Sequence, residues 1–422
     1  MKKLALSLMT LFLVGGSFAL QAQEIEKQLV IEERKNDPKS EESPYVILVS
    51  LDGFRYDYIE KHEAKFLAEL ANLGTKAESL IPSYPSVTFP NHYSIVTGMY
   101  PGHHGLVGNN MYDRNTEERY SLGNAKAVTD AKWYGGTPLW VLAEQQGMLS
   151  ACYYWPGSEA PIQKVLPTYY YKYSEKSDID SRLVQVKEWL KLPAEKRPHF
   201  ITFYMPEVDH AGHQFGPDAE ETQKAVQYVD EAMEKLYTLV KDSGLPINLF
   251  IVSDHGMLEL DQKTLLKLPF EVNEKEMAVA SNGTYVSLFI KDPKKIKTWY
   301  EKIKKSIDPK LMEVHLKDNL PQEYHFGSKD DRYNRVGDIV LTAHAPYYFT
   351  NRPLAGSHGF DPAKVKEMHA LFMAVGPNIK EKHTIKSFEN VHIYPMIAKI
   401  LGLSVDEKQL DGTGAVAKEV LK

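Results

Sequence analysis

One apolar run constrains the fold of this chain more than any other feature. Residues 45–51 read Tyr-Val-Ile-Leu-Val-Ser-Leu, without alternation between apolar and polar positions. A strand that helices cover on both faces has this appearance, because neither face meets water. Comparable apolar runs lie at residues 199–204, 247–252, 338–341 and 370–375. Amphipathic helical patterns alternate with these runs and lie at residues 63–73, 218–240 and 391–401. Strands that alternate with helices predict an α/β fold with a mostly parallel central sheet flanked by helices.

The composition changes on either side of this pattern and suggests domain boundaries. Residues 23–43 are rich in Glu, Lys, Asp and Ser, which predicts a solvated linker. We expect one folded domain over residues 44–422, because large α/β chains often remain a single unit. Inside it, residues 292–335 are rich in lysine and predict a small inserted α+β lobe, whose lysines suit the solvated face of a helix.

The first residues have the pattern of an export signal. Lys2 and Lys3 precede an apolar run and then small residues, which predicts a cleaved signal peptide over residues 1–22. A membrane anchor is the alternative, but the run is too short to span a bilayer comfortably. Cys152 is the only cysteine, so no internal disulfide forms. A bacterial protein of the periplasm, or a secreted one, fits both observations.

Charge and hydropathy limit the partners that this chain can have. Lys and Arg number 50 and Asp and Glu 56, which gives a net charge of −6. Without a basic excess, a nucleic-acid polymer is not the expected partner. No segment after the signal is apolar enough for stable membrane insertion, and we expect a monomer.

Acids and histidines follow several of the predicted strands. Ligands of open parallel sheets bind beyond the carboxyl ends of the strands. A single acid at such a point is usually a turn or capping residue, whereas several acids beside histidines suit zinc or a similar divalent ion. Two of these residues are four apart, so that one helical turn would direct both at one ion. The residues are Asp52, Asp209, His213, Asp254, His255 and His358.

Residues 88–98 form a second candidate element, which begins Thr-Phe-Pro-Asn-His. The prolines before it predict that a helix starts near Thr88, where a hydroxyl would face backbone N–H groups and bind phosphate. Taken alone, Thr88 is best interpreted as an N-cap. A neighbouring cation would lower the pKa of its hydroxyl and make it a nucleophile, so the metal clusters favour the catalytic interpretation.

These segments resemble the nucleotide pyrophosphatase/phosphodiesterase family of the alkaline phosphatase superfamily, from Tyr45 to the C-terminal helix. The most specific stretches are residues 88–98, 155–158, 209–213, 253–257 and 356–359. The resemblance implies an alkaline-phosphatase-like fold and two zinc ions per chain. One ion would be held by Asp209, His213 and His358, and the other by Asp52, Asp254 and His255, with Thr88 completing its shell.

The resemblance also implies a mechanism. Thr88, activated by one zinc, would attack in line and form a nucleotidyl-threonine intermediate, while Asn109 would hydrogen-bond a phosphate oxygen. The expected activity is hydrolysis of phosphodiester and phosphoanhydride bonds in small nucleotides to nucleoside 5′-monophosphates. No arginine or lysine follows Thr88, as one would in sulfatases or phosphate monoesterases, and this favours a diester.

By the same resemblance, four side chains would contact the nucleotide. Phe89 and Tyr170 would stack on the base, and Leu122 and Tyr204 would line the pocket. Tyr170 could instead pack internally, because several tyrosines adjoin it. Relatives that cleave lysophospholipids lack a segment after the asparagine motif. Residues 114–132 keep the full length of this segment, which favours nucleotides over lysophospholipids as substrates. The alternatives are a non-nucleotide phosphodiesterase, a phosphatase or phosphonate hydrolase with the same metal site, and a non-catalytic metal-binding protein.

Overall fold

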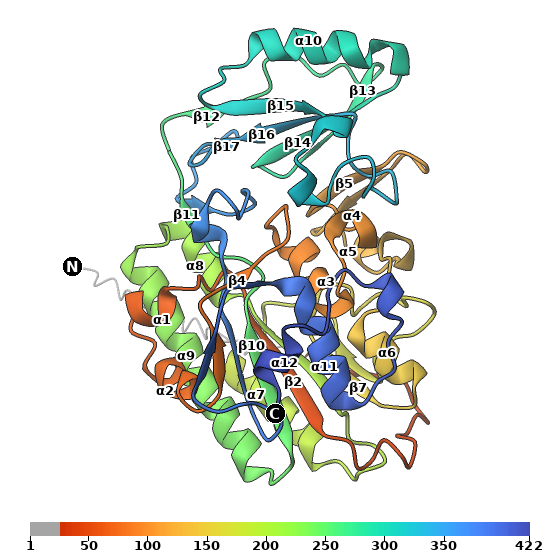
Figure 1. The fold of residues 1–422 in the computed structure, drawn as a ribbon, viewed down its shortest axis with the longest axis vertical. Coiled ribbons are helices and arrows are strands. Elements are labelled where there is room, and N and C mark those ends of the chain that lie inside the picture. The colour runs from red at the N-terminus through yellow and green to blue at the C-terminus, as the bar shows by residue number, and fades with distance from the viewer. Residues whose placement is uncertain (1–25) are drawn as a thin grey trace, which may run out of the picture.

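A nine-stranded sheet forms the centre of the computed structural model, which describes residues 26–422 (Figure 1). The strand order is β1-β8-β7-β9-β2-β10-β19-β3-β20. The five strands from β8 to β10 run parallel to one another, whereas β1 and β19 run antiparallel to their neighbours. The bounds are β1 Leu29–Val30, β2 Tyr45–Leu51, β3 Thr75–Ala77, β7 Ser150–Tyr153, β8 Tyr169–Tyr171, β9 Phe200–Met205, β10 Ile247–Val252, β19 Phe372–Val375 and β20 His383–Ile385.

Helices cover both faces of this sheet, as the apolar runs predicted. Val46 and Leu48 of β2 pack into one core cluster, and Ile47 and Val49 into another on the opposite face. Each such side chain contributes about 1.5–3 kcal/mol when fully buried. The second cluster includes side chains of α9 and α2, and the first includes side chains of α11 and α6. Figure 1 shows these two pairs of helices on different sides of the sheet. The helices are α2 Lys65–Ala71, α7 Ile179–Lys191 and α9 Glu220–Asp242, and α3 Thr88–Thr97, α6 Leu139–Gln145 and α11 Ile393–Leu401.

The predicted fold class is confirmed, with one strand placed wrongly. The runs at 45–51 and 247–252 coincide with β2 and β10. The run at 338–341 belongs instead to β16 (Ile339–Ala343), which lies in a separate antiparallel sheet. Ile339 and Leu341 are buried there as well, so hydropathy alone could not distinguish the two sheets.

The segment predicted to be a solvated linker packs against the domain in its described part. β1 pairs with β8 and so extends the central sheet by one strand. Asn36 is 1% exposed, and its side-chain Nδ2 donates to the carbonyls of Ala194 and Arg197 at 2.8 and 2.7 Å. The polar composition concealed these contacts, because backbone pairing and one buried amide leave no hydrophobic pattern. The predicted signal peptide, residues 1–22, lies outside the described residues.

The inserted lobe is an antiparallel sheet, in the order β13-β14-β16-β15, with one helix packed against it. It occupies the top of Figure 1 and extends beyond the predicted range of 292–335 at both ends. The lysines of its helix are exposed, as their pattern indicated. The bounds are β13 Met277–Ser281, β14 Tyr285–Ile290, α10 Ile296–Ser306 and β15 Met312–Leu316.

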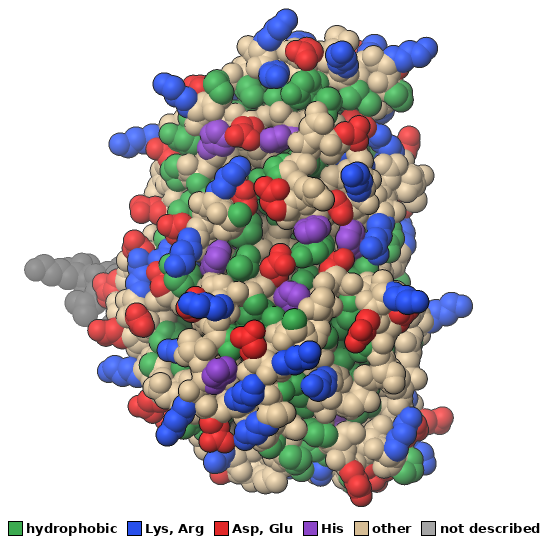
Figure 2. Space-filling model, in the orientation of Figure 1, with side chains coloured by type: hydrophobic (Ala, Val, Ile, Leu, Met, Phe, Trp, Pro, Cys, Tyr) green, Lys and Arg blue, Asp and Glu red, His purple; other side chains and the backbone are tan. Residues whose placement is uncertain are grey.

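Two observations bear on the molecular surface. Basic and acidic side chains are interspersed over the face in Figure 2, with no large area of one sign. Among residues 26–422, no helix combines the length and the apolar character that crossing a bilayer requires.

His103 connects three distant parts of the chain. Its Nδ1 lies 2.8 Å from Asp411 near the C-terminus, and its Nε2 lies 3.0 Å from Asp330, in the segment between β15 and β16. Burial lowers the pKa of His103, but the hydrogen bonds to these two carboxylates outweigh it, so the pKa lies above its ordinary value. Both ring nitrogens can donate only in the protonated ring.

The stability contributed by His103 should therefore depend on pH. A group whose pKa is raised on folding stabilises fully below its unfolded pKa, about 6.5 for histidine, and loses this contribution as the pH rises through the folded value. We expect His103→Gln to be less stable than the natural protein by an amount that is constant below about pH 6 and shrinks above it. Chemical denaturation over a pH series measures the difference, and one that did not vary with pH would contradict the assignment.

Candidate active site

The strand order brings three carboxylates to one edge of the central sheet. β9, β2 and β10 are parallel neighbours, so their carboxyl ends lie side by side. Asp52 follows β2 directly, and Asp254 follows β10 after one serine. After β9 comes α8 (Glu207–Phe215), which carries Asp209 and His213 one turn apart. The topology thus collects residues that are far apart in the sequence.

The first cluster consists of Asp52, Asp254 and His255, all at most 1% exposed. The Nε2 atom of His255 lies 2.9 Å from Asp254 Oδ2 and 3.5 Å from Asp52 Oδ1. Thr88 Oγ1 lies 3.2 Å from the same Nε2. These atoms are close enough to share one metal ion, with the Thr88 hydroxyl beside it.

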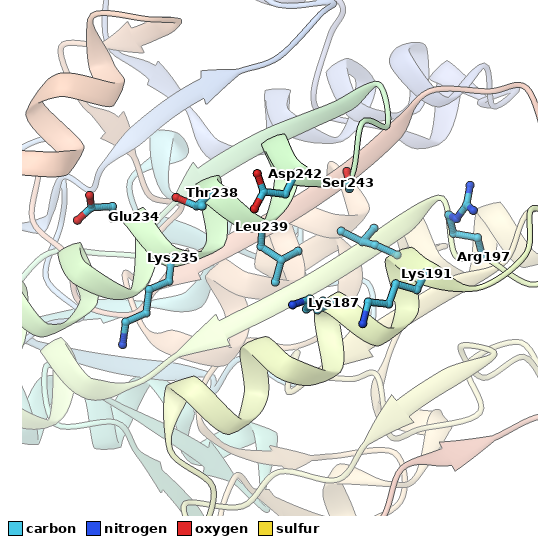
Figure 3. Close-up of a pocket in the computed structure, with 10 residues that line it drawn as sticks. Lys187, Lys191, Arg197, Glu234, Lys235, Thr238, Leu239, Asp242 and Ser243 are labelled. Atoms are coloured by element: carbon cyan, nitrogen blue, oxygen red, sulfur yellow. The ribbon is translucent and has the colours of Figure 1, made fainter.

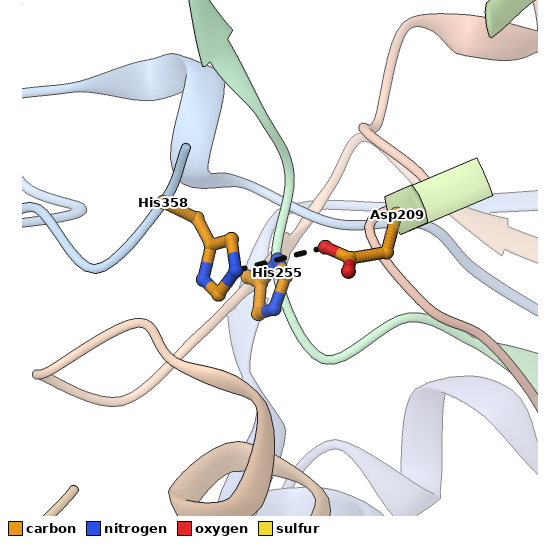
Figure 4. A group of neighbouring side chains, drawn as sticks. All are labelled: Asp209, His255 and His358. Carbon is orange, nitrogen blue, oxygen red and sulfur yellow. Dashed lines mark ion pairs between the residues drawn. The ribbon is translucent and has the colours of Figure 1, made fainter. Parts of the chain in front are cut away.

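The second cluster adjoins the first and contains Asp209, His213 and His358. The Nε2 atoms of the two histidines are 3.1 Å apart, and they lie 3.4 and 3.6 Å from Asp209 Oδ1. In Figure 4 the His255 ring appears between His358 and Asp209. The His255 ring stacks on the His358 ring, with 3.4 Å between the two ring centroids. His255 therefore borders both clusters.

Unpartnered carboxylate oxygens indicate that this site is built for cations. Within the described part of the chain, Asp52 Oδ1, Asp209 Oδ1 and Asp254 Oδ2 are buried without a hydrogen-bond partner. Burial, together with the charges of Asp254 and Asp209, raises the pKa of Asp52 well above its ordinary value. Buried carboxylates in such proximity are unfavourable unless a cation offsets them.

The histidine rings are oriented to present lone pairs to the same space. The Nδ1 atoms of His213, His255 and His358 each lie 2.9–3.0 Å from a backbone carbonyl oxygen. A carbonyl can only accept a hydrogen bond, so Nδ1 carries a proton, and in the neutral ring Nε2 is left with its lone pair. Burial, followed by the charges of His255 and His213, lowers the pKa of His358, which keeps that ring neutral. Metal-ligating histidines have this arrangement.

The hydroxyl of Thr88 is not used to cap its helix. The N-cap of α3 is Val87, in extended conformation, and Thr88 is the first helical residue. The N-cap interpretation of Thr88 is therefore wrong. The next backbone N–H, that of Phe89, donates to Asn109 Oδ1 at 3.0 Å. This bond holds the Asn109 side chain beside the first turn of α3.

His92 is a residue of the site that the sequence interpretation missed. It lies one helical turn after Thr88, so both side chains share a face of α3. Its Nε2 contacts Ser50 Oγ at 2.7 Å, and its Nδ1 lies 3.2 Å from Asp254 Oδ2. Burial raises the pKa of Asp254, but the facing His255 and His92 outweigh it, so the pKa lies well below its ordinary value. The four-residue spacing between Thr88 and His92 was the one sequence signal that could have placed His92 on the same helix face as Thr88.

A cavity of about 510 Å³ opens beside the two clusters. Phe89, Leu122 and Tyr204 line it, as the sequence suggested. Tyr170 does not, because β8 pairs it with Cys152 and its ring packs in the core. The tyrosine of this run that lines the cavity is Tyr173, which is 44% exposed. A run of adjacent tyrosines does not reveal its own register, and the choice of Tyr170 was wrong for this reason.

A larger depression of about 810 Å³ lies between α7 and α9 (Figure 3). Its walls carry side chains of both charges, among them Lys187, Lys191 and Asp242. It contains none of the residues in the two Asp/His clusters, so size alone does not mark the reactive site.

Comparison with known proteins identifies the family. Residues 46–361 match the family described as type I phosphodiesterase / nucleotide pyrophosphatase. The chain belongs to this family. Two buried groups, Asp52 with Asp254 and His255, and Asp209 with His255 and His358, each bring their ligand atoms close enough to hold a metal ion. The resemblance inferred from the sequence is confirmed.

Curated relatives of this chain are longer proteins. Mouse ectonucleotide pyrophosphatase/phosphodiesterase family member 1 is 35% identical over 382 residues, which cover 87% of this chain and 42% of the mouse protein. Venom phosphodiesterase 2 of Crotalus adamanteus is 35% identical over 374 residues, which cover 86% of this chain and 46% of the venom protein. The chain therefore spans less than half the length of these two relatives.

Solved structures share the fold of this chain. Mouse ectonucleotide pyrophosphatase/phosphodiesterase 5, in an inactive threonine-to-alanine form in complex with AMP, superimposes with a TM-score of 0.80 at 25% identity, over 89% of this chain and 100% of the mouse chain. The human protein of the same name gives a TM-score of 0.82 at 25% identity. The superposition covers 89% of this chain and 99% of the human chain.

Metal content tests the two clusters directly. We expect about two divalent ions per chain in the natural protein, and about one in His213→Ala, which removes one imidazole from the second cluster. His210→Ala is the matched control on the same helix, because His210 is 51% exposed and belongs to neither cluster, and it should retain about two ions. Elemental analysis of the dialysed proteins gives the stoichiometry. Equal metal content in all three proteins would refute the role of His213.

Proposed function

We propose that this protein hydrolyses phosphodiester and phosphoanhydride bonds of small nucleotides to nucleoside 5′-monophosphates, with Thr88 as the nucleophile. The observation that carries the proposal is the position of Thr88 Oγ1, 3.2 Å from His255 Nε2 at the edge of the first cluster. A second Asp/His cluster and an aromatic-lined cavity adjoin the same hydroxyl. Family membership supplies the reaction class, and this geometry supports Thr88 as the attacking group.

Two zinc ions per chain suit the ligands present. Asp52, Asp254 and His255 would hold one ion with Thr88, and Asp209, His213 and His358 would hold the other. Mixed carboxylate and imidazole sets are typical of zinc. When bound, zinc acts as a Lewis acid that lowers the pKa of a neighbouring hydroxyl and offsets negative charge on phosphoryl oxygens.

The side chains define the course of the reaction. The Thr88 hydroxyl loses its proton, a bond forms between Oγ1 and phosphorus, and the bond to the leaving oxygen breaks as that oxygen takes up a proton. Water then hydrolyses the phosphothreonine ester, which restores Thr88 and releases the nucleoside 5′-monophosphate. Asn109 Oδ1 is engaged by Phe89 N–H, so its Nδ2 is directed by that bond and can donate to a phosphoryl oxygen.

The retained nucleoside fits the 510 Å³ cavity. Phe89 and Tyr173 line it and can stack on a base, a contact that contributes roughly 1–3 kcal/mol per base without selecting one base. Leu122 and Tyr204 complete its walls. The related mouse structure in complex with AMP contains the kind of product proposed here.

The proposed diester preference rests on charge. A phosphate monoester carries one more negative charge than a diester and needs an additional cation. Among residues 26–422, those that line the 510 Å³ cavity include no lysine or arginine. We also propose action in a periplasm or outside the cell, which rests on the signal-like sequence of residues 1–22.

Two measurements test this function. The natural protein should cleave thymidine 5′-monophosphate p-nitrophenyl ester faster than p-nitrophenyl phosphate. Thr88→Ala should lose at least about 10³-fold in kcat because it removes the nucleophile, while retaining its metal, and Thr88→Ser should keep part of the activity. Faster cleavage of the monoester would indicate a phosphatase, and near-normal turnover of Thr88→Ala would exclude this nucleophile. Cleavage of lysophosphatidylcholine instead of nucleotide esters would point to a lipid substrate.

A further inference from the structure

The described N-terminal segment is fixed to the domain along its length. We call residues 26–36 the N-terminal strap. Gln28 accepts a hydrogen bond from Trp189 Nε1 at 3.2 Å, β1 pairs with β8, and the Asn36 side chain donates to two backbone carbonyls. The match to the family begins at residue 46, so the strap lies outside the matched residues. Family membership therefore assigns no role to the strap.

The direction of β1 brings the start of the strap to the ligand-binding edge of the sheet. β1 runs antiparallel to β8, with Leu29 opposite Tyr170. The residues that precede β1 therefore lie near the carboxyl end of β8, and the ligands of such sheets bind at the carboxyl ends of the strands. Tyr154 directly follows β7, the parallel neighbour of β8, at the same edge. Glu26 and Tyr154 meet there.

The carboxylate of Glu26 binds two separate segments of the domain. Its Oε2 accepts one hydrogen bond from the Tyr154 hydroxyl and a second from Ser177 Oγ at 2.9 Å. Burial and the hydrogen bond to Glu26 raise the pKa of Tyr154, so its hydroxyl keeps the proton that it donates. Ser177 belongs to the segment between β8 and α7, which also carries Tyr173. One side chain of the strap thus joins the residue after β7 to the segment after β8.

Both of these segments contribute to the wall of the 510 Å³ cavity. Tyr154 and Tyr173 line it, and their rings meet edge to face with 5.3 Å between the centroids. Tyr173 meets Tyr204 in the same way at 6.0 Å, and the Tyr204 hydroxyl donates to Asp52 Oδ2 at 2.5 Å. A continuous file of aromatic rings thus leads from Glu26 to the first cluster. A displacement of Tyr154 or Tyr173 would change the surface that a bound nucleoside meets.

The conformation of Tyr154 depends on contacts of this kind. Its φ is +63°, in the left-handed region that an aromatic residue rarely adopts. Such a conformation persists where surrounding contacts hold it, and it is frequent at functional sites. The Tyr154 side chain is buried, and the bond to Glu26 fixes the far end of its ring. Tyr173 is 44% exposed, so its position depends more on the segment that Ser177 anchors.

We propose that the N-terminal strap is part of the substrate site, with Glu26 as a positioning residue that holds the rings of Tyr154 and Tyr173 in place for the retained nucleoside. Glu26 acts through these two tyrosines and not on phosphorus. Its loss should therefore weaken the binding of the nucleoside and leave the chemical step as it is. The inference rests on the proposed function and adds to its site a segment whose composition resembles a linker.

Two esters with the same leaving group separate nucleoside binding from the chemical step. Thymidine 5′-monophosphate p-nitrophenyl ester carries the nucleoside, and methyl p-nitrophenyl phosphate has a methyl group in its place. In Glu26→Ala the KM for the thymidine ester should rise about fivefold, a part of what base stacking contributes, with kcat unchanged. The kcat/KM for the methyl ester should not change. An equal loss on both esters, or no change on either, would overturn the role of Glu26. If the natural protein cleaves neither ester, the proposed function fails and the inference falls with it.

Further variants assign the effect to the two hydrogen bonds. Glu26→Gln keeps an oxygen that can accept both bonds, and it should restore most of the natural KM. Glu32→Ala is the matched control, because Glu32 lies in the same strap, is exposed, and should leave the cleavage of both esters unaffected. In a Tyr154→Phe background, which lacks the hydroxyl, Glu26→Ala should raise the KM less than it does in the natural protein. An effect of full size in that background, or a similar effect of Glu32→Ala, would refute the coupling.

Discussion

Three buried carboxylates that face one another are the constraint on which the rest of this structure depends. Asp52, Asp209 and Asp254 present oxygens without hydrogen-bond partners to a common space, and burial with mutual repulsion raises the pKa of Asp52. Such a group of charges is unfavourable in a protein interior unless cations offset it. The site is therefore intelligible only as a metal centre, and the catalytic role proposed for Thr88 follows from its place beside that centre.

The surrounding fold holds these groups in position. Parallel strands bring the carboxylates to one edge, and backbone carbonyls fix the rings of His213, His255 and His358 with Nε2 toward the centre. Each element contributes in its own way: the buried strand β2 ends at Asp52, and one turn of α8 aligns Asp209 with His213.

Much of this arrangement could be predicted from the sequence, because the signals were strong and local. Apolar runs located β2 and β10, and the six Asp and His residues at strand ends lie together in the structure. The failures concern features without a hydrophobic or spacing signal. Backbone pairing of β1 was concealed by polar composition, and the register of the tyrosines around Tyr170 is set by β7. Both the pairing of β1 and the register of these tyrosines depend on contacts with residues that are distant in the sequence.

A crystal structure of the zinc-loaded protein, with anomalous scattering recorded at the zinc edge, tests the central claim most directly. The account predicts two anomalous peaks roughly 3.5–4 Å apart, the spacing of two-metal hydrolytic sites, one beside Thr88 and one beside His213. A single peak, or peaks elsewhere in the molecule with the carboxylates of Asp52 and Asp209 left without a cation, would contradict it.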